Sequence, residues 1–471
     1  MPQLGPGAGT LGLSHTARAA MTSLPASSAA TADTFAASTA LPPDDDWREM
    51  LHNEVHARPS ARIRLPALVF TVAVLNHGVS REDEWAHLKQ LPGQAGLRLE
   101  DLHGNFLRLR FADHTLKWER HTEFTRYAVV QPLPEGAGLD HAEPALLDQL
   151  VLPPDWLRAV PGRTVAALQL VMLETDITDP HAALAAAQRW FGGRTVVASL
   201  MGNGHSMAVT NFRLRTDGFE RLLVLAPPGT TETRAGRISQ RLLEIEIYRL
   251  MALRGLPVAK ALAPVLAESE SALATVTARL EARESSEAEL LDQLIHVAAR
   301  VERATAEHQY RFSATEAYDA LVRQRLTELR EKPIPGTQTI GEFMQRRLSP
   351  AIATVAATAQ RLGSLSQRIE RSSALLRTRV DIATETQNHQ LLAKLTRGQE
   401  LQLHLQSTVE GLSIAAISYY VISLLLYGGK AAKAAGLPLN PEMAAGAAIP
   451  LVLWAVWQAT RRIHRRLHTQ D

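Results

Sequence analysis

The sequence predicts an α+β fold in three parts: a duplicated β-α-β-β-β cytoplasmic unit, long helices with coiled-coil character, and a C-terminal transmembrane hairpin of two helices. Three observations predict it. Strand-like apolar runs and one helical segment occur twice between residues 62 and 225, apolar residues then recur every three to four positions, and two stretches near the C-terminus carry no charge. With 471 residues the chain is long enough for two or three domains.

Composition excludes several classes of protein. The chain has no cysteine, which rules out disulfides, thiol nucleophiles, cysteine-ligated zinc and iron–sulfur clusters. Its 50 Lys and Arg are nearly balanced by 48 Asp and Glu, so the net charge is only +2. This balance argues against a dedicated nucleic-acid binder. We therefore expect no nucleic-acid partner. We also expect no cofactor.

Residues 1–46 are predicted to be a disordered tail. Residues 1–43 are dominated by Ala, Ser, Thr, Gly and Pro, and they lack an apolar segment of the length that a secretory signal needs. Whether residues 1–43 belong to the mature protein is open.

Residues 47–229 are predicted to form the duplicated α/β cytoplasmic domain. Short strings support the duplication: LHGN at 102–105 corresponds to LMGN at 200–203, and FTRY at 124–127 to FERL at 219–222. The two units either share one sheet or face each other, and chance similarity of short strings is the alternative. The predicted strands are 65–75, 105–111, 116–121 and 124–130, then 165–173, 195–200, 206–212 and 219–225, with helices at 81–91 and 180–191.

Residues 230–349 are predicted to be helical and residues 350–410 to form one long stalk helix. Apolar periodicity indicates helices at 237–253, 257–283 and 286–330, and a Pro- and Gly-containing break follows at 332–336. The stalk carries a heptad seam at Val355, Leu362, Ile369, Leu376 and Ala383. This seam packs either against the two preceding helices or between chains, and the second alternative predicts a homo-oligomer.

Residues 411–460 are predicted to cross a lipid bilayer twice, with spans at 411–429 and 443–460. Each stretch is close to the ~20 residues that span a bilayer core. The tail at 461–471 carries Arg461, Arg462, Arg465 and Arg466, and this excess of positive charge places the C-terminus in the cytoplasm. Both termini are then cytoplasmic, in the cytoplasmic (inner) membrane. A buried hairpin of a soluble bundle is the alternative.

One cluster near the N-terminus has the composition of a chemical site. It contains His52, Asn53, Glu54, His56 and Arg58. The imidazoles at i and i+4 would share a helical face and could ligate a divalent metal beside Glu54, but Pro59 disfavours a helix through Arg58. A hydrogen-bonded structural or ligand-binding polar cluster is the preferred interpretation, and the metal is unknown.

The segment from Gly202 to Ser206 has glycines like those of a phosphate-binding loop, but it lacks the full glycine pattern and the Gly-Lys-Ser/Thr of a P-loop. A tight β-turn is therefore favoured. No nucleophile elbow is present either. We predict no catalytic residues and expect that the protein is not an enzyme.

Three strings carry a resemblance to a family: NEVHARP at 53–59, LRTRVDI at 376–382 and TVEGLSIAAISYY at 408–420. With these strings the chain resembles an uncharacterised bacterial family of predicted membrane-anchored proteins, a domain of unknown function. The overall plan is also similar to that of the CorA magnesium channels, which carry a Gly-Met-Asn motif after the first span. This sequence has Tyr427-Gly428-Gly429-Lys430 there, and Lys430 would repel a cation at a pore mouth.

These features predict a membrane-anchored protein of unknown activity that serves as an oligomeric scaffold or a binding module, with a cytoplasmic protein as a further partner. The alternative is a divalent-cation channel or transporter, with Gly411, Ser413, Ser418 and Ser423 lining a pore, although such small residues also serve helix packing. A metal-dependent enzyme that uses His52, Glu54 and His56 is a third hypothesis.

Overall fold

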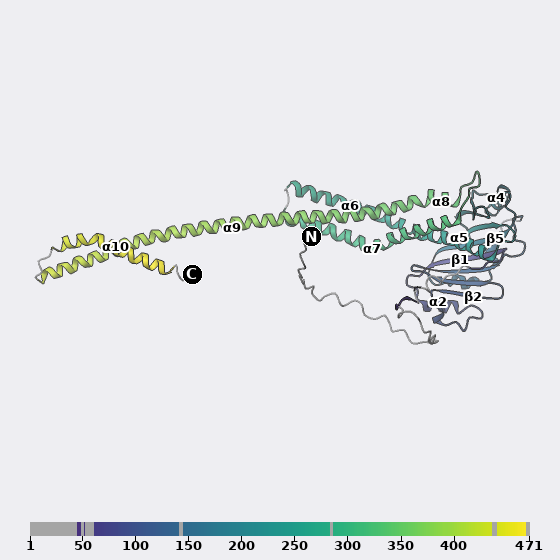
Figure 1. Cartoon of the computed structure of the whole chain (residues 1–471), viewed down its shortest axis with the longest axis horizontal. Coiled ribbons are helices and arrows are strands. Elements are labelled where there is room, and N and C mark those ends of the chain that lie inside the picture. The colour runs from purple at the N-terminus through teal and green to yellow at the C-terminus, as the bar shows by residue number, and fades with distance from the viewer. Residues whose placement is uncertain are drawn as a thin grey trace, which may run out of the picture. The chain divides into compact units, whose positions relative to one another are not determined.

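The computed structural model describes residues 45–48, 51, 61–140, 145–282, 286–435 and 440–467. The chain divides into a unit of residues 1–59 and a unit that runs from Ser60 to Asp471, and the elements below belong to the second unit. This unit has a mixed α+β architecture, with an eight-stranded sheet followed by long helices (Figure 1).

The sheet has the strand order β2-β3-β4-β1-β5-β8-β7-β6, so the two predicted units share one sheet. The antiparallel pair β1 and β5 joins them at the centre. Every predicted strand is present to within a few residues. Their bounds are β1 Ala67–Leu75, β2 Phe106–Arg110, β3 Thr115–Arg120, β4 Phe124–Pro132, β5 Arg163–Glu174, β6 Val197–Met201, β7 Ser206–Leu214 and β8 Glu220–Ala226.

The predicted duplication is not confirmed. The order strand, helix, three strands does recur, but β1 is antiparallel to β4 whereas β5 is parallel to β8. The strings also differ in position: residues 124 and 219 stand at the starts of β4 and β8, but residues 102–105 precede β2, whereas residues 200–203 lead out of β6. The match between LHGN and LMGN therefore joins two places that are not structurally equivalent.

The two faces of the sheet are covered by different helices. One face packs against α2 (Arg81–Leu88), α3 (Pro154–Arg158) and α4 (Pro180–Gln188), which contribute Leu88, Trp156 and Leu184 to its core. The other face packs against α5 (Glu232–Leu253). The side chain of Thr231 caps the N-terminus of α5 by accepting a hydrogen bond from the backbone N–H of Arg234.

Three long helices form a bundle beyond the sheet: α6 (Gly255–Ala282), α7 (Glu287–Leu329) and the first part of α9 (Ser349–Ala434). Val355, Leu362, Ile369 and Leu376 of the predicted seam are buried in its core. This part of the seam therefore packs within the chain, as the first of the two alternatives describes. The short helix α8 (Ile340–Arg347) was not predicted, although Thr339 and Glu342 form a capping box at its start.

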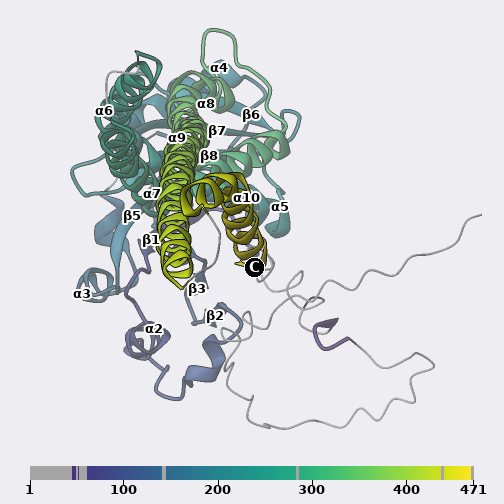
Figure 2. The same ribbon diagram turned by 90° about the vertical axis from the view of Figure 1, so that its left-hand side faces the viewer.

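The long helix α9 continues far past the bundle. Its 86 residues correspond to a length of about 130 Å at 1.5 Å per residue. From 384 to 409 every residue is exposed. The last part of α9 then packs beside α10 (Pro441–Leu467), which turns back along it (Figure 2). Gly429 permits a close approach near the turn, because an added Cβ would lie 3.2 Å from the Cβ of Pro441.

Candidate functional site

The C-terminal helices expose a large apolar surface. Leu412 is 74% exposed, Leu424 70% and Leu451 67%. By length and composition, three helical stretches are able to cross a membrane: Glu232–Ala282, Ile340–Ala434 and Pro441–Arg462. The predicted spans fall in the second and third of these stretches.

The first stretch, which contains α5 and α6, was not predicted as a span. The buried side chains of Leu242, Ile245 and Met251 cover the sheet, and Leu262 and Leu266 enter the core of the bundle. Packing inside the protein thus accounts for the apolar composition of this stretch. In the second and third stretches only a small share of the most apolar segment is buried, although the start of the second stretch packs inside the protein as α8 and the bundle part of α9.

The four residues of the predicted pore or packing face differ in how far they are buried. Ser418 is only 2% exposed and is buried in the monomer, whereas Gly411 and Ser413 are exposed and Ser423 is half-buried. The hydroxyl of Ser413 donates to the backbone carbonyl of Val409 one turn earlier. Ser418 therefore has the placement of a helix-packing residue.

The arginines that predict topology lie at the end of α10. Arg461 places its guanidinium over the ring of Trp457, 4.9 Å from the ring centre, and Arg462 is exposed. The side chains of Arg465 and Arg466 lie outside the described residues. A cation stacked on tryptophan at the end of an apolar helix is typical of the level of lipid headgroups.

The predicted N-terminal cluster of His52, Asn53, Glu54, His56 and Arg58 lies outside the described residues. Within the part of the chain that the structure describes, no group of three or more His, Asp and Glu side chains is arranged to hold a metal ion. The described residues thus offer no second candidate for a metal centre.

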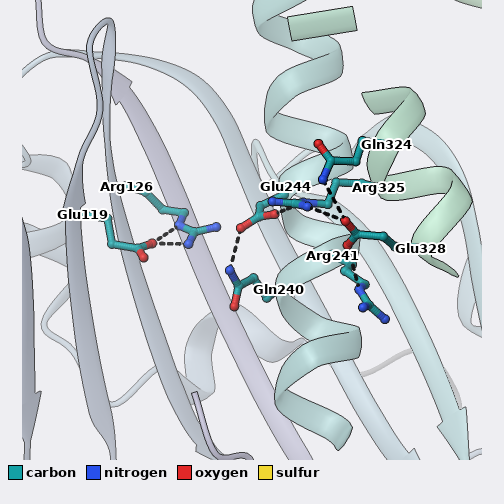
Figure 3. A network of polar contacts seen from close by, with 8 residues as sticks. All are labelled: Glu119, Arg126, Gln240, Arg241, Glu244, Gln324, Arg325 and Glu328. Carbon is teal, nitrogen blue, oxygen red and sulfur yellow. Dashed lines mark hydrogen bonds and ion pairs between the residues drawn. The ribbon is translucent and has the colours of Figure 1, made fainter. Parts of the chain in front are cut away.

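An ion network lies where the sheet faces the helices, with one part on the sheet and one on the helices (Figure 3). On the sheet, Glu119 of β3 and Arg126 of β4 are cross-strand partners, and Nε of Arg126 donates to Oε2 of Glu119 over 2.6 Å. Lys117 adds a second cation, with its Nζ 2.7 Å from Oε1 of Glu119. All three residues are at least nine-tenths buried. Such charges are tolerated inside a protein only when they are paired.

The helices carry the second half of this network. Glu244 of α5 accepts hydrogen bonds from Gln240 of the same helix and from Arg325 of α7. Arg325 also contacts Glu328 over 2.9 Å, and Arg241 of α5 contacts Glu328 over 3.2 Å. Figure 3 shows Glu244 between Arg126 on the sheet and Arg325 on α7. These contacts tie α5 and α7 to each other beside the sheet.

Electrostatics within the network favours the charged forms. Burial by itself would raise the pKa of Glu119, but the positive charges of Arg126 and Lys117 more than offset this and lower the pKa to about 2. The negative charges of Glu119 and Glu244 raise the pKa of Arg126 against the effect of its burial. Because every carboxylate here is paired with a cation, the network is suited to hold elements together and not to transfer protons.

In a second buried cluster two carboxylates share one cation. Glu220 at the start of β8 and Glu246 of α5 share one cation, Arg249, whose Nη2 lies 3.3 Å from Glu220 and 2.6 Å from Glu246. Burial, together with the negative charge of Glu246, raises the pKa of Glu220 to about 9. The raised pKa favours the protonated form of Glu220.

Neither cluster was found from the sequence. The strands that contain Lys117, Glu119 and Arg126 do not show by their alternation which face a helix covers. The charged residues of α5 and α7 that face them are more than 100 residues away. The only local signal is the presence of charged residues inside strands that are otherwise apolar.

Comparison with known proteins places the chain in a family. No curated protein and no solved structure matches it. The family described as "Protein of unknown function (DUF3422)" matches residues 43–467, which include the NEVHARP string, the sheet, the bundle and both predicted spans. The match covers most of the chain, and the chain therefore belongs to this family of proteins of unknown function.

Proposed function

We propose that this protein is a non-enzymatic scaffold or binding module, anchored in the cytoplasmic (inner) membrane by a hairpin of α9 and α10, with both termini in the cytoplasm. The observation that carries the proposal is the apolar surface of the hairpin. Leu412, Leu424 and Leu451 are each at least two-thirds exposed in the chain, and each would be favoured in a bilayer.

Anchoring and topology can be tested by cysteine labelling, because the chain has no cysteine of its own. Lys433→Cys, at the end of α9 near the connection to α10, is expected to react with a membrane-impermeant maleimide added outside intact spheroplasts. The matched variant Arg303→Cys, on the exposed surface of α7, is expected to react only after lysis. Equal labelling of both variants in intact spheroplasts would contradict the topology, and release of the chain by carbonate washing would contradict the anchor.

The proposal also includes a homo-oligomer formed through α9. The exposed part of this helix carries an apolar stripe of 3-4 spacing, interrupted by Gly398 and Gln402, that has no partner in the described chain. It consists of Leu391, Leu395, Leu405, Val409 and Leu412, each at least 58% exposed. A repeat of this spacing is the pattern by which helices pair in coiled coils. A second copy of the chain is the partner that would cover it.

Oxidative cross-linking tests the oligomer. Leu405→Cys, on the repeat, is expected to form a disulfide between two copies, whereas Glu400→Cys, on the opposite side of the helix, is not. Light scattering of the wild type in detergent supplies the independent measurement. A strict monomer at micromolar concentration, with no cross-link at Leu405→Cys, would refute the oligomer and leave the anchor untouched.

One further measurement tests the alternative of a divalent-cation channel or transporter. The wild type is reconstituted in vesicles and assayed for magnesium uptake. Flux above that of empty vesicles would replace the scaffold with a channel, and its absence would support the scaffold.

A further inference from the structure

A basic cavity of about 460 Å³ lies where three distant segments meet. They are the turn between β6 and β7, the first turns of α5 and the C-terminal end of α7. The predicted turn at Gly202–Ser206 is confirmed, and it is fixed to α7 because the N–H of Gly202 donates to the carbonyl of Leu329 over 2.8 Å. The size of the cavity is within the range of small-molecule sites, about 300–1,000 Å³.

Four arginines line this cavity: Arg234, Arg237 and Arg241 from α5, and Arg330 from the end of α7. Arg241 is paired with Glu328, the only acidic residue in the lining. Within the described residues, no carboxylate pairs with Arg234, Arg237 or Arg330. The lining therefore carries a net charge of +3, and three guanidinium groups are available for an anion.

The turn and the arginines are close together. A Cβ added at Gly202 would lie 3.6 Å from Nη2 of Arg234, so the guanidinium of Arg234 lies against the glycine of the turn. Burial, and to a smaller degree the positive charge of Arg234, lowers the pKa of His205 in the same turn. The hydroxyl of Thr231, whose residue also lines the cavity, caps the N-terminus of α5, where the helix dipole favours negative charge.

An independent observation is a buried hydroxyl without a partner. Ser206 lines the cavity and is 0% exposed, and its Oγ has no hydrogen-bond partner in the described chain. Ser206 begins β7, and its neighbour Met207 belongs to the core on the opposite face of the sheet, so Ser206 is directed to the α5 face, where the cavity lies. A buried hydroxyl that makes no hydrogen bond is costly, and a ligand oxygen would satisfy it.

We propose that this cavity binds a ligand that carries a phosphoryl or diphosphate group, with Arg234, Arg237 and Arg330 around the anion and the hydroxyl of Ser206 donating to one of its oxygens. Charge selects this class, because a single carboxylate would neutralise one guanidinium and leave two, whereas a diphosphate of charge −2 to −3 matches the three. Planar guanidinium groups also bind phosphate oxygens in pairs.

The proposal deepens the binding role in the proposed function and rests on it, but it does not depend on the membrane anchor or the oligomer. The same chemistry has two sources, a soluble phosphorylated compound and the phosphate of a lipid headgroup. Both are tested on the purified full chain in a phosphate-free maltoside detergent. Inorganic pyrophosphate represents the soluble source and short-chain phosphatidic acid the lipid source.

Isothermal titration calorimetry is expected to show saturable binding of at least one of these probes. Arg234→Gln and Arg237→Gln are each expected to weaken it about tenfold or more, and Ser206→Ala by a smaller factor. Arg237 is exposed, so its substitution should not affect folding. The control Arg303→Gln removes an exposed arginine of α7 outside the cavity and should leave the affinity unchanged.

The two probes distinguish the two possible sources of the ligand. Binding of pyrophosphate alone identifies a soluble ligand, and binding of phosphatidic acid alone identifies a lipid headgroup. No binding of either probe to the wild type, or an equal loss in Arg303→Gln, would overturn the site. Because cysteine labelling and cross-linking report the anchor and the oligomer separately, failure of the anion site can be told apart from failure of those two.

Discussion

Gly236→Ala should destabilise the protein even though alanine is the better helix former. Gly236 lies inside α5, where a Cβ would stand 1.6 Å from the carbonyl oxygen of Ala61 and 2.8 Å from its carbonyl carbon. Since real Cβ atoms essentially never come within 3.0 Å of a non-bonded heavy atom from another part of the chain, the segment that enters β1 would have to move away from α5. This segment is held by the hydrogen bond from the N–H of Ile63 to the carbonyl of Glu232, 3.1 Å long.

The magnitude follows from two opposing effects. Replacing glycine by alanine inside a helix gains about 1 kcal/mol of helix propensity. Forcing the segment away costs about 1–3 kcal/mol for overpacking, about 1 kcal/mol for the lost hydrogen bond, and part of the burial of Ile63, which is 1% exposed. The cost exceeds the gain, so we expect a net loss of about 1–3 kcal/mol in the free energy of unfolding.

The matched control is Gly363→Ala on α9, where a Cβ would meet nothing within 4 Å. At this position only the higher helix propensity of alanine acts, so the free energy of unfolding should rise by up to about 1 kcal/mol. The assay is thermal unfolding of both full-length variants in detergent, followed by tryptophan fluorescence, for which Trp118, Trp156 and Trp190 are buried reporters in the sheet domain. The two variants should shift Tm in opposite directions, and an increase in both would refute the clash.

Three further outcomes are expected. Arg126→Met leaves Glu119 buried with one cation fewer and should cost about 3–5 kcal/mol in denaturant unfolding, and a loss below 1 kcal/mol would show that the network is dispensable. Glu220 has a folded pKa of about 9 against an ordinary value of 4.5, so its contribution to stability is complete below pH 4.5 and is lost as the pH rises towards 9. Glu220→Gln, which mimics the protonated acid, should therefore lose less stability than the wild type between pH 5 and 9, and parallel pH profiles would contradict the raised pKa. Leu365→Ala, in the bundle core at 1% exposure, should cost about 2–5 kcal/mol, whereas an unchanged Tm would mean that the bundle does not pack in this way.

Local patterns predicted most of the secondary structure because each element leaves a short-range signal. The strand-like segment at 206–212 and the continuous apolar run at 65–75 correspond to β7 and β1, and the Pro- and Gly-containing break at 332–336 separates α7 from α8. The helix α8 was missed because eight residues contain too few turns for a clear period, even though the capping box at Thr339 was visible.

The candidate sites were much less predictable. The turn at 202–206 was identified as a turn, and its resemblance to a phosphate loop was set aside because the glycine pattern is incomplete. Its part in a basic cavity depends on Arg234 and Arg330, which lie about 30 and 130 residues further along the chain. No local pattern records which arginines the fold will bring beside a turn.

The sequence by itself determined the periods of the strands and helices, the two uncharged stretches near the C-terminus and the basic tail after them, because these are properties of neighbouring residues. Only the tertiary structure decided that β5 pairs in parallel with β8, that the heptad seam from Val355 to Leu376 packs inside one chain, and that Arg126 and Glu244 lie on facing elements. Each of these depends on contacts between segments far apart in sequence, where the free energy of burying a shared surface selects the partner and local propensity does not.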